Sequence, residues 1–443
     1  MLRPTRRQRD QRAQALIILL WAWAVLPRIA QTFTAPKVHQ SIEQAAAPYS
    51  HIASLLITFT TLLLGAFCAF VIATSLTDLP RTRFGPLAAL LLPWVCIVVR
   101  DLYIPAGVSR SMFVYPLVVI SLWLLRPRLR TLATLGLLVG LTAVISLATG
   151  ILAPSRGIFR LTTGDFASED KQVLPWGILV GIFTQGNNLA QFMVLGMPPI
   201  AAIRRKGARR FFMAIALFAM IWGASRSCMI AVGMVVLTYA AVRLCRGASR
   251  TVVAGFCVLL GFAAVVALPF LPHQETSFSN RGYIWNQSLR AAHQALTFGL
   301  GANWYSKVAL TTGALGPTVF HGHNQFVQLL VTGGFVLVAA VAVMLLVLTR
   351  SALSLSARGR LWGVLYLVAL AGSGLLEVSL VFVDNFILAP VVVIPLCYIA
   401  FGRVESVTSR EPDTPEAEGA SAGDEATPPV TRPALSPVGR RHG

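Results

Sequence analysis

Two histidines and an asparagine stand directly before a long apolar run in the stretch HGHNQFVQLLVTGGF. A neutral imidazole accepts a proton near pH 7, so His321 or His323 suits a general base acting on a hydroxyl group. If a helix begins at Asn324, which is a good N-cap residue, both histidines lie in the preceding loop. If the helix already includes His321, one polar face would carry His321, Gln325, Gln328 and Thr332, and His323 would point elsewhere. This pattern favours a functional site over the alternative, a histidine that only anchors the helix.

The same two histidines also suggest a metal site, because the spacing HxH supplies two imidazole ligands. Such a site needs a further ligand, and His273, Glu275 and His293 have no diagnostic spacing. We therefore expect neither a metal nor any other cofactor.

Arginines in two polar segments are candidates for binding an anionic group. Arg226 lies in GASRSCMIA, where serines flank it at a predicted helix start, a setting that suits anionic oxygens. Arg281 lies in SFSNRGYIWNQSLRAAHQALTFGLG, which predicts an amphipathic helix capped by Ser279 or Asn280 and ended by the glycines of GLG. That helix would lie over the mouth of the bundle and present Arg281 to it. The alternatives are an interfacial Arg226 and an Arg281 that only caps its own helix.

Four amides interrupt an apolar segment: Gln185, Asn187, Asn188 and Gln191. Such groups are costly in lipid unless they face the bundle interior or water, so they either bond to neighbouring helices or line a polar cavity. Glu377 and Asp384 are similar, and we expect them to pair with arginines at the same end of the bundle.

The composition defines what must position these residues. The chain has 443 residues, is 56% hydrophobic and 12% charged, and has a mean hydropathy of +0.70, which predicts an all-α, polytopic membrane bundle. The net charge of +20 is spread through short loops rather than gathered in a patch, so we expect no nucleic-acid partner. The six cysteines lie in or beside apolar runs and form no CxxC pair, which predicts buried thiols without disulfides or zinc.

Apolar runs predict about twelve membrane-spanning helices. They lie near 13–30, 51–76, 84–99, 111–125, 131–153, 176–200, 211–224, 227–244, 251–271, 325–349, 361–380 and 386–402. The first run could also be a signal peptide, but no small-x-small cleavage site follows promptly, so we favour an uncleaved helix. The predicted organisation is a basic N-terminus (1–12), a transmembrane domain (13–402) with a large outer loop (273–324), and a disordered tail (403–443).

Loop charge predicts the orientation. With the N-terminus in the cytoplasm, the inner loops hold 21 Lys and Arg residues and the outer segments hold 11. Both termini would then be cytoplasmic, and the loop 273–324 and the two histidines would face outward.

Four pieces follow one another in order: GNNLAQFMVLGMP, SRS at 225–227, Arg281 with Trp285 and then GLG, and HGHNQFVQLLVTGG. By these motifs and their order, the sequence resembles the bacterial O-antigen ligase and O-antigen polymerase family of membrane glycan transferases. The motifs cover roughly residues 170–345, and the predicted topology extends the resemblance to the whole chain. Two positions depart from the family pattern. Leu337 stands where a second glycine is frequent, and Thr297 and Phe298 precede GLG where proline is common.

The resemblance implies a glycan carried on a polyprenyl diphosphate, an acceptor hydroxyl, and transfer at the outer face of the bacterial cytoplasmic membrane without nucleotide or metal. By position it implies His323 as the essential histidine and Arg226 and Arg281 as contacts of the diphosphate. Guanidinium groups would stabilise the leaving group in place of a metal. The residues expected to bind substrate are His321, Asn324, Asn188, Gln328 and Trp285.

The motifs do not separate two activities within the family. A ligase transfers the glycan to a different molecule, such as a lipid core, whereas a polymerase transfers it to another repeat unit. We predict ligase-like transfer and keep the polymerase as the alternative. A transporter is the alternative of another class, but a transporter would place its polar cluster near mid-membrane on two related halves, and no repeat is visible.

Overall fold

The computed structural model describes residues 5–35, 49–75, 84–103, 108, 110–159, 172–309, 321–382 and 387–403. This part of the chain is almost entirely helical, as the composition predicted. Its one sheet is a two-stranded antiparallel pair of β1 (Ile158–Phe159) and β2 (Ile178–Leu179). Asp384, the tail after Arg403 and positions 310–320 of the predicted outer loop lie outside the described residues.

Seven of the described helices are long and apolar enough to cross a membrane. They are α1 (Arg6–Thr34), α3 (His51–Ser75), α4 (Phe84–Leu102), α6 (Leu132–Leu152), α10 (Arg226–Leu244), α11 (Gly247–Ala267) and α14 (Gln325–Ala357). Shorter helices occupy the other predicted spans: α5 (Val114–Leu125), α8 (Gly186–Ala201), α9 (Lys206–Trp222), α15 (Trp362–Gly374) and α16 (Ala389–Phe401). Each predicted range thus overlaps a helix, while about twelve spans stays a prediction.

The remaining described elements are short or lie outside those ranges. They are α7 (Pro154–Gly157), α12 (Ser277–Ala292), the 3-10 helices η2 (Arg110–Phe113), η3 (Leu129–Thr131), η5 (Leu268–Phe270) and η6 (His293–Ala295), and the π-helix η7 (Trp304–Ala309). Helix α8 begins later than its predicted span, because residues 178–179 pair with β1 instead of joining the helix.

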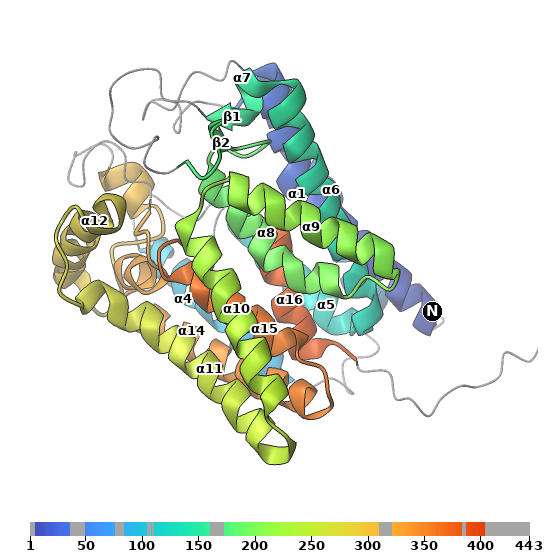
Figure 1. The fold of residues 1–443 in the computed structure, drawn as a ribbon. Coiled ribbons are helices and arrows are strands. Elements are labelled where there is room, and N and C mark those ends of the chain that lie inside the picture. Colours follow the sequence, from blue (N-terminus) through green and yellow to red (C-terminus); the bar gives the residue numbers. More distant parts are fainter. Residues whose placement is uncertain are drawn as a thin grey trace, which may run out of the picture. The chain divides into compact units, whose positions relative to one another are not determined.

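Burial divides the helices into inner and outer ones. Nearly every residue of α15 and α16 is buried, whereas α3 and α11 each expose a row of large apolar side chains, including Phe59 and Phe256. Exposed apolar rows on long helices are what a lipid environment requires. Figure 1 shows α12 beyond the end of α11, apart from the long helices, which places it at one end of the bundle.

Helix α14 is interrupted at Gly334, and the segment after α12 fills the interruption. Gly334 has φ 61° and ψ −163°, a conformation open essentially to glycine alone. The amides of Leu300 and Phe335 donate to the carbonyls of Val331 and Leu296 at 2.7 and 2.8 Å. These bonds satisfy backbone groups that the break frees and fasten the end of the α12 segment to α14.

Candidate functional site

The carboxylate of Glu377 is the centre of a polar cluster that four segments build. Glu377 is 2% exposed and lies between α15 and α16, outside both helices. Its Oε1 accepts hydrogen bonds from Arg281 of α12 and, at 2.6 Å, from Asn187 in the first turn of α8. Its Oε2 lies 3.5 Å from Nδ1 of His323 and 3.8 Å from Nε2 of His321. A buried carboxylate is thus paired with a guanidinium and surrounded by donors, as a charge in a poorly hydrated place requires.

The two histidines are loop residues, because α14 begins at Gln325 with Asn324 as its N-cap. The first alternative drawn from the sequence is therefore the one the structure has. His323 has φ +46°, in the left-handed region, and its amide donates to Nδ1 of His321 at 3.2 Å. This turn places the centroids of the two imidazole rings 4.0 Å apart. Both rings face the carboxylate of Glu377. A non-glycine residue in this conformation stores local strain, which is common at functional sites.

Asn324 is fully buried, and its side-chain oxygen and nitrogen form hydrogen bonds within the fold. Its Oδ1 caps α14 by accepting from the amide of Val327 at 3.0 Å. Its Nδ2 donates to the carbonyls of Val265 in α11 and Leu375 after α15, both at 3.0 Å. In this arrangement Asn324 positions the histidine turn, and its expected contact with substrate stays a prediction.

Trp285 supports the same turn from α12. It is fully buried, its Nε1 donates to the carbonyl of His323 at 3.4 Å, and its ring packs edge-on against His273. Residues 278–280 all have positive φ, so regular helix begins only at Arg281, directly after Asn280, one of the two predicted cap residues. The helix ends at Ala292, before the GLG glycines that were expected to end it. Arg281 also donates to the carbonyl of Phe278 at 3.1 Å and so serves both to close its own turn and to bind Glu377.

The amides of α8 and the polar face of α14 are used mainly for helix packing. Asn187 reaches Glu377, whereas Asn188 is half-buried and donates to the hydroxyl of Thr184 at 3.4 Å. Gln191 is buried and donates to Ser373, Val378 and Ser379, and Gln325 bonds the backbone of residues 379 and 380. Gln328 accepts from the amide of Gly322 at 2.8 Å and so holds the turn between the histidines.

Arg226 is the first residue of α10 and is exposed. The hydroxyls of its neighbours Ser225 and Ser227 lie 3.1 Å apart and are buried. Gly223, three residues before Arg226, packs against Gly186 at the start of α8, next to Asn187. The start of α10 therefore belongs to the same end of the bundle as the Glu377 cluster.

The cluster determines the charge of its members. Burial favours the neutral form of Glu377, but the nearby His323, Arg281 and His321 outweigh it and lower the pKa of Glu377 to about 2. Burial, together with the charges of His323 and Arg281, lowers the pKa of His321 to about 3 despite the attraction of Glu377. At neutral pH the site therefore holds an ionised Glu377 and an uncharged His321.

The structure supplies the third metal ligand that the sequence did not. One ligand atom each from His321, His323 and Glu377 lie within 4.8 Å of one another. However, Glu377 already binds Arg281 and Asn187, and a guanidinium on the same carboxylate would repel a divalent ion. The donor set is therefore a poor fit to a resident cation.

Glu377 and Asn187 are the members of this cluster that the sequence did not place among the candidate site residues. The expected pairing of Glu377 with an arginine is confirmed by its bond to Arg281. The available signal was an acidic residue inside the apolar stretch GSGLLEVSLVF, where an unpaired charge is too costly to keep.

The fold and the site define a helical membrane protein with a buried charged cluster at one end of its bundle. Residues 211–342 match the family model described as O-antigen ligase. The match includes Arg226, Arg281 and both histidines, and it supports the O-antigen ligase and polymerase family that the order of the motifs indicated. No curated protein matches the chain.

Proposed function

We propose that this protein transfers a glycan from a polyprenyl-diphosphate carrier to an acceptor hydroxyl at the outer face of the bacterial cytoplasmic membrane. The observation that carries the proposal is the convergence of His321, His323 and Arg281 on Glu377 within and beside the segment that matches the O-antigen ligase family. The reaction is ligase-like, and repeat-unit polymerisation is the alternative within the same family. Its partners are the lipid-linked donor, a lipid or glycan acceptor, and membrane lipids.

His323 is the residue that activates the acceptor. The carboxylate of Glu377 near Nδ1 favours the tautomer with a proton on Nδ1, which leaves the Nε2 lone pair for a hydroxyl proton. His321 is uncharged, and its Nδ1 already accepts from the amide of His323, so it orients the turn that holds the base. This arrangement follows the general logic of a base oriented by a carboxylate.

The arginines stabilise the charge of the departing diphosphate. Arg281 is bonded to Glu377, so an arriving diphosphate would share or take over that guanidinium. Arg226, exposed at the start of α10, offers a second guanidinium at the same end of the bundle. Two bidentate donors aimed at phosphate oxygens would favour bond breaking without a metal ion.

The direct test is transfer by purified protein given a polyprenyl-diphosphate-linked glycan and an acceptor. His323→Ala, Arg226→Ala and Arg281→Ala should each abolish transfer and leave the donor unconsumed, while the protein still inserts and purifies. The matched controls are His293→Ala and Arg290→Ala, which change exposed residues on or directly after α12 and should retain activity. Normal transfer by His323→Ala would overturn the proposed chemistry.

Product analysis separates the two activities. A ligase gives one glycan joined to a foreign acceptor, whereas a polymerase lengthens the chain on the carrier. In a deletion strain, full-length chains left on the carrier indicate a lost ligase, and single repeats indicate a lost polymerase. Cysteines introduced in the loop 273–324 should react with a reagent that cannot cross the membrane when it is added outside; labelling only from the cytoplasm would overturn the outer location.

A further inference from the structure

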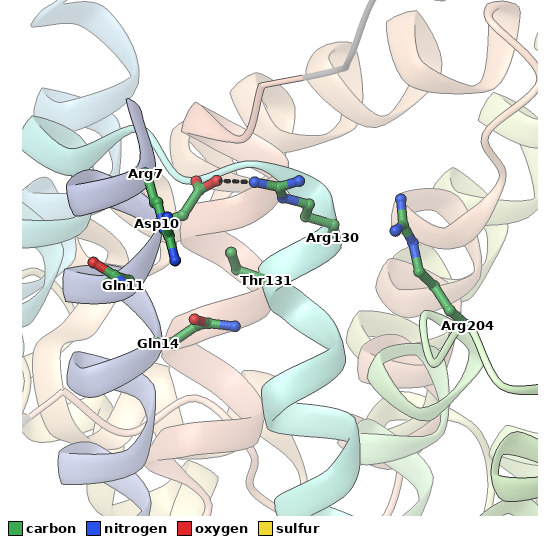
Figure 2. A pocket seen from close by; sticks show the side chains of 7 residues that line it. All are labelled: Arg7, Asp10, Gln11, Gln14, Arg130, Thr131 and Arg204. Atoms are coloured by element: carbon green, nitrogen blue, oxygen red, sulfur yellow. Dashed lines mark hydrogen bonds and ion pairs between the residues drawn. The ribbon is translucent and has the colours of Figure 1, made fainter. Parts of the chain in front are cut away.

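A second polar site lies at the other end of the bundle. Helix α8 connects the two ends, because Asn187 in its first turn bonds Glu377 and Arg204 follows its last residue by three positions. Sixteen helical residues separate the ends of α8 by about 24 Å. A pocket of about 320 Å³ opens at the Arg204 end (Figure 2), and its lining residues are Arg7, Asp10, Gln11, Gln14, Arg130, Thr131 and Arg204.

The lining of this pocket has an excess of positive charge. Three arginines and one aspartate give it a net charge of +2. Asp10 is buried and already paired, at 2.9 Å with Arg130 and at 3.6 Å with Arg128. Figure 2 shows Arg204 on the opposite side of the pocket from Asp10 and Arg130. The side chains of Arg7 and Arg204 form no hydrogen bond or ion pair with another residue in the part of the chain that the structure describes.

Apolar side chains continue from the pocket along the seam between α1 and α6. On α1, Gln14 and Ile18 are one turn apart, and Ile18 is exposed. On α6, Thr134 accepts a hydrogen bond from Gln14 at 3.3 Å, and Leu137 and Leu141 follow on the same face, both exposed. A polar, basic pocket therefore leads into an apolar surface that runs toward the middle of the bundle.

We propose that this pocket binds the phosphate group of an anionic phospholipid, whose acyl chains lie along the α1–α6 seam. The guanidinium groups of Arg7 and Arg204, which have no partner among the described residues, provide the charge. Gln11 and Gln14 provide neutral hydrogen-bond donors for the headgroup. The apolar seam favours a lipid over a free phosphate, because a soluble anion makes no use of it. Basic pockets between transmembrane helices recognise acidic headgroups by this combination. The inference stands independently of the proposed transferase, since the two sites share no residue.

The test is native mass spectrometry of the purified full-length protein with added phosphatidylglycerol, phosphatidylcholine or sn-glycerol 3-phosphate. We expect phosphatidylglycerol to bind in preference to phosphatidylcholine, and the double change Arg7→Gln, Arg204→Gln to weaken it by about fivefold for each arginine. The matched control is Arg210→Gln, an exposed basic residue on α9 outside the pocket lining, which should bind like the unchanged protein.

Three results would overturn the proposal. Equal binding of the two lipids would show ordinary lipid contact without headgroup recognition. Unchanged phosphatidylglycerol binding in the double variant would place any recognition elsewhere. Displacement of phosphatidylglycerol by equimolar sn-glycerol 3-phosphate would mean that the pocket takes a soluble anion. Because Arg7 and Arg204 are exposed, loss of folding is not expected, and the melting temperature of each variant checks this.

Discussion

Arg281 and Glu377 form an ion pair between segments that lie 96 residues apart in the sequence. Arg281 begins the regular part of α12, and Glu377 follows α15, so the pair joins the segment that lies over the bundle end to the bundle itself. Because Glu377 also faces both histidines, this one contact couples the position of α12 to the geometry of the candidate base.

Replacing Glu377 should therefore reduce catalysis more than it reduces folding. Glu377→Gln keeps the side-chain shape and one acceptor but removes the charge that orients His323 and holds Arg281. We expect transfer to fall by roughly 10²–10⁴-fold, the usual contribution of a well-placed acid–base group. The measurement is kcat and KM with the lipid-linked donor. A change confined to KM would mean that Glu377 acts only through the donor-binding arginine.

Asn187 offers a milder version of the same experiment. Asn187→Ala removes the 2.6 Å hydrogen bond to Glu377 and leaves the ion pair with Arg281 intact. We expect a loss of activity smaller than that of Glu377→Gln, on the order of tenfold, since one hydrogen bond to a charged group contributes about 1.5–3 kcal/mol. Asn188→Ala is the comparison variant at the neighbouring position, because Asn188, which the sequence predicts to bind substrate, bonds Thr184 rather than Glu377 among the contacts described for its side chain. Equal losses in both variants would argue against a special role for Asn187.

The break in α14 should be sensitive to any side chain at Gly334. A Cβ there would collide with the backbone of Thr297, and the conformation itself is closed to other residues. Gly334→Ala should lower the melting temperature clearly and loosen the segment after α12. Gly359→Ala is the control, because Gly359 has φ +82° but open space around it, so it bears only the backbone cost of about 1–2 kcal/mol. Similar melting temperatures for the two variants would contradict the proposed docking of residues 296–301.

The lowered pKa of His321 predicts a pH effect on stability. The unfolded chain protonates this imidazole near pH 6.5, whereas in the fold it stays neutral down to about pH 3. Between those values the unfolded state binds more protons, so this residue makes the folded protein less stable as pH falls from 6.5 toward 3. His321→Gln should therefore lose less melting temperature than the unchanged protein between pH 7 and pH 5. Parallel pH curves would contradict a neutral His321.

Metal removal tests the alternative use of the same three residues. We expect a chelator to leave transfer by the purified protein unchanged, because Glu377 is already satisfied by Arg281 and Asn187. Strong inhibition that an added divalent ion reverses would instead assign His321, His323 and Glu377 to a cation. Anomalous scattering or elemental analysis of the purified protein provides a readout that does not depend on activity.

The sequence by itself determined the local features of this protein. Long apolar runs require helices in a membrane, because no other element satisfies its own backbone there, and each predicted range overlaps one. Asn324 is the N-cap of α14 because its side chain accepts from the amide three residues ahead, a strictly local bond. The order of the motifs around Arg226, Arg281 and His323 indicated the family for the same reason, since order is a property of the chain alone.

Only the tertiary structure decided which residues meet. On a regular helix His321 and His323 would point in different directions. In the structure the positive φ of His323 turns both rings toward the carboxylate of Glu377. Asn187 rather than Asn188 faces that carboxylate, because the rotation of α8 depends on how it packs against α15 and the segment after it. Glu377 is buried, so water cannot solvate its charge and a charged partner must stabilise it. The tertiary structure supplies that partner, Arg281, from another helix.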